Sequence, residues 1–63
     1  MTIYSVIKNK NKNVQVRDIA DKIGITREAM SRKLAKDFFT KDELAKIIKI
    51  MEFDSDDILR MFL

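Results

Sequence analysis

Residues 16–34, VRDIADKIGITREAMSRKL, decide the fold of this 63-residue chain. Apolar or small side chains recur there at i, i+3, i+4 and i+7, which predicts one buried helical face: Val16, Ile19, Ala20 and Ile23. Gly24 follows directly, and a glycine adopts the positive φ of a residue just past a helix end without a Cβ clash. Thr26 then offers a hydroxyl to cap a second helix, expected from about Arg27 to Ala35.

The spacing within this stretch is that of a helix-turn-helix motif over about residues 16–35. The small side chain of Ala20 lets the second helix cross close over the first, and Gly24 permits the sharp turn. Ile25 and Met30 supply apolar anchors one and six positions beyond the glycine. An ordinary helical hairpin with an alanine and a terminal glycine has the same spacing, so DNA binding and a plain hairpin both fit this motif.

Composition narrows the class of protein. The chain is long enough for one domain, spanning residues 1–63, and it has no cysteine or histidine, so neither a disulfide nor a zinc site is expected. Proline is absent, there is one glycine, and 46% of the residues are apolar, which favours an all-α fold. No apolar run approaches the length of a membrane span and no signal peptide is evident, so a cytoplasmic protein is expected.

Catalysis has little support in this sequence. There is no histidine or cysteine, no glycine-rich phosphate loop, and no room for a pocket of substrate size in 63 residues. We therefore expect no enzyme, no cofactor and no small-molecule substrate.

Charge is unevenly distributed along the chain. Residues 1–36 carry nine basic and three acidic groups, a net of +6, whereas residues 37–63 carry four basic and seven acidic groups, a net of −3. The proposed two-helix unit and the segment before it thus form the positive half, which suggests a polyanionic partner. Solvated lysines on a small helical protein produce a similar imbalance.

The rest of the chain predicts three more short helices. Residues 2–9 form the first, capped by Thr2, and the alternating Asn and Lys of residues 9–13 indicate a loop. Residues 40–43, TKDE, form a capping box that opens a helix with a clear apolar stripe: Leu44, Ile47, Ile48 and Met51. Phe39 is expected to fill the gap before this helix. Residues 54–57, DSDD, cap a last helix at Asp54 or Ser55 and lack the spacing of a calcium loop.

The second helix of the motif presents Glu28 and Arg32 away from its inward contacts, Met30 and Leu34. Glu28 and Arg32 are an i, i+4 pair in the favourable order, so a surface ion pair explains them. Contacts with base edges explain them equally, and the spacing does not decide between the two.

The order of these segments is similar to a known family. The run IADKIGITREAMSRKL, then Phe39–Thr40 and ELAKIIKIMEFDSDDILRMF, resembles the Cro/XRE-type helix-turn-helix proteins, particularly small phage Cro or repressor DNA-binding domains, over residues 3–62. The resemblance implies five short helices in a lambda-repressor-like fold. It also implies a bacterial or prophage-encoded transcriptional regulator that binds a palindromic operator in double-stranded DNA as a homodimer.

The resemblance also implies which residues contact DNA. The base-reading candidates are Arg27, Glu28, Ser31 and Arg32. The phosphate-binding candidates are Asn13, Gln15, Arg17, Thr26, Lys36, Thr40 and Lys41, with free amides expected at the start of the fourth helix. Two departures stand out. Ala35-Lys36-Asp37 replaces the Asn-Gly of many relatives, and Val16 replaces a polar residue, so one contact is missing or comes from Gln15 or Arg17.

Five of the last six residues are apolar. Some of them are expected to fold onto the core and the rest to meet a second subunit, at an interface made by Ile58, Met61, Phe62 and Leu63. This ending favours a complete Cro-sized protein over the head of a longer repressor. A second hypothesis remains open: a protein-interaction module, antirepressor-like or antitoxin-like, whose helix-turn-helix does not serve DNA.

Overall fold

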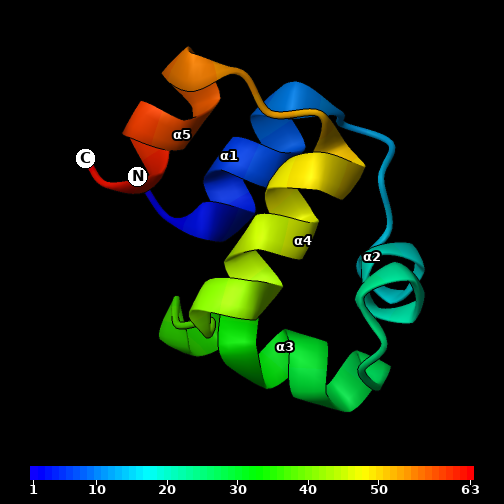
Figure 1. Ribbon diagram of the computed structural model, residues 1–63. Helices are drawn as coiled ribbons and strands as arrows, with labels where there is room; N and C mark the ends of the chain where they lie inside the picture. Colours follow the sequence, from blue (N-terminus) through cyan, green and yellow to red (C-terminus); the bar gives the residue numbers. More distant parts are fainter.

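The computed structural model describes all 63 residues, which form five short α-helices and no strand (Figure 1). The helices are α1 (Ile3–Lys10), α2 (Val16–Ile23), α3 (Arg27–Lys36), α4 (Lys41–Met51) and α5 (Ser55–Met61). The all-α prediction with five short helices is confirmed. No helix has both the length and the apolar character that crossing a membrane requires.

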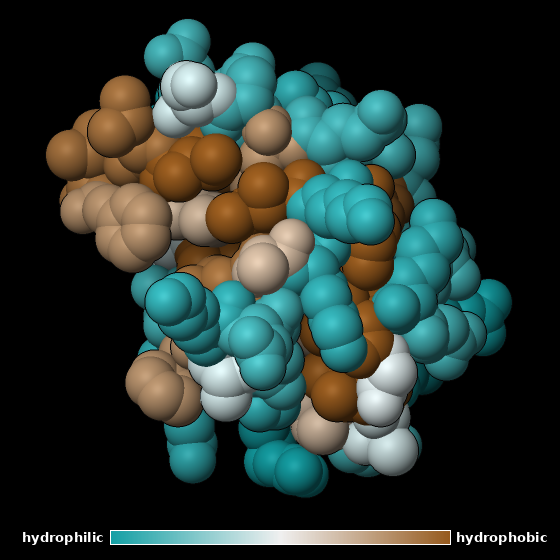
Figure 2. Space-filling view, in the orientation of Figure 1, coloured by the Kyte–Doolittle hydropathy of each residue, from teal (hydrophilic) through white to brown (hydrophobic).

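The helices are arranged so that α2 and α3 adjoin each other while α5 packs on α1 (Figure 1). Both termini lie beside α5, on the side of the view away from α2. The space-filling view shows hydrophobic side chains gathered at this end, whereas hydrophilic side chains cover much of the remaining face (Figure 2). On this face, the two ends of the molecule therefore differ in surface chemistry.

Side-chain caps fix where four of the five helices begin. The capping side chains are those of Thr2, Thr26, Thr40 and Asp54. In each, a side-chain oxygen accepts a hydrogen bond from the backbone amide three residues further along the chain. Thr40 and Asp54 each head a full capping box, in which Glu43 and Asp57 accept the N-cap amide in return. The predicted caps at Thr2, Thr26 and Thr40 are confirmed, and Asp54 is the cap of α5. Loss of such a cap typically costs about 1 kcal/mol.

Left-handed residues end three of the helices. Gly24 ends α2 with φ 83°, as the sequence predicts. Asp37 ends α3 with φ 54° and Glu52 ends α4 with φ 55°. After α3, the Phe38 amide donates to the Lys33 carbonyl at 3.0 Å, which closes the helix end in the usual double-turn geometry. Asp37 thus takes the place that a glycine would hold in this turn.

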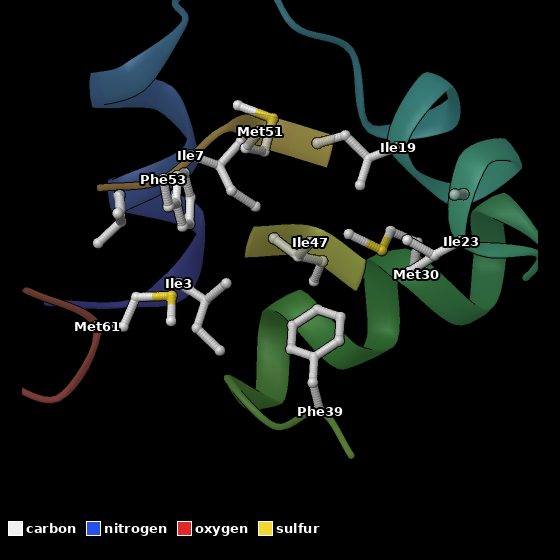
Figure 3. Close-up of a cluster of buried hydrophobic side chains, with 12 residues drawn as sticks. Ile3, Ile7, Ile19, Ile23, Met30, Phe39, Ile47, Met51, Phe53 and Met61 are labelled. Atoms are coloured by element: carbon white, nitrogen blue, oxygen red, sulfur yellow. The ribbon is translucent and has the colours of Figure 1, made fainter. Parts of the chain in front are cut away.

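The core consists of twelve buried apolar residues contributed by all five helices and by the two segments that flank α4 (Figure 3). The predicted face of α2 is confirmed, since Ile19, Ala20 and Ile23 are buried and Val16 packs at the edge of the core. Ile47 of α4 is fully enclosed at the centre. Phe39 is 5% exposed and fills the gap before α4, while its neighbour Phe38 is 66% exposed.

The predicted loop at residues 9–13 begins too early. Asn9 and Lys10 belong to the last turn of α1, where the Lys10 ammonium lies 3.0 Å from the Asp57 carboxylate and 4.0 Å from that of Asp54. This pairing joins the C-terminal end of α1 to the N-terminal end of α5. A cation there also suits the negative end of the α1 dipole, so the polar Asn-Lys run continues the helix instead of ending it.

The prediction that Met61 lies at a subunit interface is wrong. Met61 is 9% exposed and belongs to the core, because α5 turns Asp57 and Met61 inward toward α1. Ile58 is half-buried against the core, whereas Phe62 and Leu63 are 74% and 88% exposed. Leu59, which the prediction left out of the interface, is 60% exposed.

Candidate nucleic-acid interface

α2 and α3 form a two-helix unit held by the turn Gly24–Thr26. The amides of Gly24 and Ile25 both donate to the Ala20 carbonyl, at 2.9 and 3.0 Å, so the chain reverses within three residues. Ala20 and Met30 are essentially without exposed surface. A Cβ added at Gly24 would meet nothing within 4 Å, so the backbone conformation alone requires the glycine.

The outward side of α3 carries all four predicted base-reading residues. We call this surface the outer α3 face; it is made by Arg27, Glu28, Ser31 and Arg32, all of them exposed. Glu28 and Arg32 do not pair, because every ion pair of the protein lies elsewhere, and no side-chain hydrogen bond within the chain engages any of the four. The outer α3 face therefore offers two guanidinium groups and one carboxylate with all their hydrogen-bonding capacity unused.

Lys33, on the inward flank of α3, behaves differently. Its ammonium lies 3.0 Å from one Glu43 oxygen and donates to the other at 3.1 Å. Two contacts stabilise the charged Glu43 carboxylate and lower its pKa: the hydrogen bond from the Thr40 amide has the larger effect, and that from the Lys33 ammonium comes second. This half-buried pair locks α3 to the start of α4. The sequence analysis missed it, although the capping box marks Glu43 and the i+3 spacing from Met30 places Lys33 on the inward side.

A cationic hollow lies beside the outer α3 face, at the start of α2. Its lining residues are Lys8, Val14, Gln15, Val16, Arg17 and Arg27, with no acid among them. Gln15 is the N-cap residue of α2, but its side chain makes no capping bond and is free to contact a ligand. The first amides of α2 also lack helical acceptors, as at every helix start. Cations, free amides and the positive end of a helix together favour an anion.

Two predicted phosphate-binding residues and one predicted base-reading residue are therefore brought together with a further cation. Gln15 and Arg17 line the hollow with Arg27, and Lys8 joins them from α1, where its ammonium donates to the Val14 carbonyl at 2.8 Å. Lys8 was missed because its place beside α2 depends on how α1 crosses the two-helix unit. Asn13 is exposed in the preceding loop but does not line the hollow.

The remaining phosphate candidates divide in two. Thr26 caps α3 at its N-terminal end, where its hydroxyl oxygen accepts from the Ala29 amide at 3.1 Å. Lys36, Thr40 and Lys41 lie at the other end of α3, all exposed. The prediction of free amides there is wrong for Thr40, whose N–H donates to Glu43 at 2.9 Å. The capping box uses that donor internally, so an anion would be left with the amides of Lys41 and Asp42.

Comparison with known proteins adds no family to this geometry: no protein-family model, no curated protein and no solved structure matches the chain. The candidate interface is thus defined by the outer α3 face, the cationic hollow at one end of α3 and the exposed Lys36 and Lys41 at the other. This surface carries hydrogen-bond donors on α3 between the cationic hollow and two exposed lysines. This arrangement suits a long polyanion with a groove wide enough for a helix.

Proposed function

We propose that this protein is a sequence-specific transcriptional regulator with a lambda-repressor-like helix-turn-helix fold, which inserts α3 into the major groove of double-stranded DNA. The observation that carries the proposal is the outer α3 face, where Arg27, Glu28 and Arg32 are exposed and free of partners within the chain. In such proteins the N-terminal half of the second motif helix contacts base edges. Arg27 and Glu28 lie in the first turn of α3, and Arg32 follows one turn later.

The chemistry of these side chains predicts what is read. A guanidinium makes a bidentate pair with the O6 and N7 acceptors of guanine, and a carboxylate accepts from the N4 amino group of cytosine. Arg27 or Arg32 with Glu28 therefore favours G·C pairs in part of each half-site. Ser31, between them on the outer α3 face, offers a small hydroxyl that suits either kind of base.

Phosphate contacts at both ends of α3 would fix the position of the helix along the base pairs. The cationic hollow, with Gln15, Arg17 and Lys8, suits a phosphate of one strand, and Lys36 with Lys41 suits a phosphate of the other. Both groups flank the same helix, so binding to them orients α3 along the groove. Because this contribution is electrostatic and independent of sequence, affinity should fall steeply with salt.

A homodimer follows from the proposal, and the outward side of α5 supports it. Asp56, Leu59 and Arg60 are exposed there, with the acid near the start of the helix and the base near its end. An antiparallel copy would place Asp56 opposite Arg60 of the partner subunit twice, around paired Leu59 side chains, with Phe62 and Leu63 adding apolar area. Successive major grooves on one side of DNA lie about 34 Å apart. The dimer must therefore hold its two copies of α3 at about that separation.

Selection from a random duplex pool is the direct test. The expected result is an enriched palindrome whose half-sites are separated by about one helical turn and contain G·C pairs. A pool in which no sequence is enriched overturns the proposal. The competing candidate is a protein-interaction module, favoured by the exposed Phe38 and by the exposed apolar residues at the C-terminal end of the chain, Leu59, Phe62 and Leu63. That function predicts weak retention on heparin and no shift of random duplex in a gel.

A further inference from the structure

An apolar groove runs beside the outer α3 face, on the side of α1. It is lined by Thr2, Tyr4, Val16, Ser31, Leu34 and Ala35, so three helices contribute to it and no charged group does. Ser31 and Ala35 come from the exposed side of α3, and Leu34 lies half-buried at its base. The Tyr4 ring forms part of the groove wall. The Lys8 ammonium lies 5.8 Å from the centre of this ring.

The groove is continuous with two parts of the proposed DNA interface. Val16 lines both the groove and the cationic hollow, and Ser31 belongs to both the groove and the outer α3 face. A strand whose phosphate lies in the hollow and whose bases face α3 therefore passes the mouth of the groove. Four of the six lining residues are apolar and the Thr2 hydroxyl already bonds to Ser5, so an apolar part of that strand gains most from entering.

We infer that the apolar groove receives the C5-methyl group of a thymine, and that Val16 and Ala35 make the protein select thymine at that position. Thymine's methyl is the one apolar group that a base pair presents in the major groove, and it lies on the side of the base nearest its own backbone. The groove shares Val16 with the hollow and Ser31 with the outer α3 face, so it lies between the proposed phosphate contact and the proposed base contacts, as such a methyl does. The apolar side chain of Val16, standing between two DNA-contacting regions, thereby has a role of its own.

The inference rests on the proposed function and is tested with the duplex enriched from the random pool. Each thymine is replaced in turn by deoxyuridine, which removes only the methyl group, and affinity is measured at fixed salt. Burial of one methyl is worth about 0.8 kcal/mol, so one thymine in each half-site should show a loss of about fourfold. In Val16→Thr, which places a hydroxyl in the groove at the same volume, the same replacement should change affinity by less than about twofold.

Two further variants complete the design. Ala35→Ser places a hydroxyl in the groove on the α3 side and should also reduce the loss of affinity caused by deoxyuridine at the same thymine. This variant provides the test if Val16→Thr does not fold. Ala45→Ser, on an exposed side of α4, should keep the full fourfold loss. An enriched motif without thymine overturns the inference, as does one in which every deoxyuridine is neutral or the penalty survives both groove variants. Those results leave the proposed function intact, whereas a pool with no enriched sequence overturns both.

Discussion

The Asp37 carboxylate accepts a hydrogen bond of 2.7 Å from the backbone N–H of Ile3, which joins the C-terminal end of α3 to the first turn of α1. Asp37 performs two tasks, because its backbone is also the left-handed residue that ends α3. Its acceptor satisfies one of the amides that a helix start leaves unpaired, and its charge suits the positive end of α1. One residue in a turn without glycine therefore both ends α3 and joins it to α1.

Substitution of Asp37 separates these two tasks. Asp37→Gly keeps the left-handed turn but loses the acceptor, and a hydrogen bond to a charged group contributes roughly 1.5–3 kcal/mol. Asp37→Ala also loses the acceptor but keeps a Cβ at positive φ, which Asp37→Gly removes, so the alanine variant should be about 1 kcal/mol less stable than the glycine variant. Urea unfolding followed by circular dichroism should rank the variants wild type, Gly, Ala. Equal stability of the two variants would show that the turn imposes no strain at this position.

Acid should destabilise the protein through two carboxylates. The hydrogen bond from the Asp54 amide, and to a smaller extent that from the Lys10 ammonium, lowers the pKa of Asp57. In the same way, the Thr40 amide and then the Lys33 ammonium lower the pKa of Glu43. A carboxylate with a lowered folded-state pKa contributes stability above its unfolded value, near 4, and that stability is lost as pH falls through the folded value. The melting temperature should therefore decrease when the pH is lowered below about 4. Asp57→Asn should weaken this drop, whereas Asp21→Asn, at an exposed position of α2 outside every ion pair, should leave it unchanged.

Arg32 and Lys36 should differ in how they affect DNA binding. Arg32→Ala should relax base preference at one position of each half-site, at a cost of roughly 1–3 kcal/mol on the selected duplex and little on random duplex. Lys36→Ala should weaken both duplexes alike and reduce the salt slope by about one. Lys49→Ala, on α4, is the matched control for loss of one charge. Equal losses on both duplexes for Arg32→Ala would show that Arg32 reads no base.

The α5 contact predicts a charge-swap result. Arg60→Glu should weaken self-association, because it places acids opposite Asp56 of a second copy of the chain. The double variant Asp56→Lys, Arg60→Glu restores complementarity in an antiparallel pair and should recover the dimer. Sedimentation equilibrium measures the self-association of both variants. Leu59→Asp should fold, because Leu59 is exposed in the single chain, and it should be a monomer, because it places two carboxylates opposite each other in the proposed interface. A double variant no better than Arg60→Glu alone would exclude the antiparallel arrangement.

The sequence by itself determined the features that depend on near neighbours. Thr26 and Thr40 cap helices through amides three residues away, and Gly24 supplies the positive φ after α2. The apolar spacing of α2 and α4 selected the faces that are buried. These features follow from backbone geometry within one or two turns, so they can be read without knowing how the helices cross.

Only the tertiary structure decided which side chains meet across helices. It paired Lys10 with Asp57, Lys33 with Glu43, and Asp37 with the Ile3 amide, and it turned Met61 into the core while leaving Leu59 outside. It also brought Lys8 to the start of α2. Periodicity states which face of a helix is apolar but not which helix covers it. Contacts between different helices are fixed by the packing of all five helices around Ile47, and so they appear only when the chain has folded.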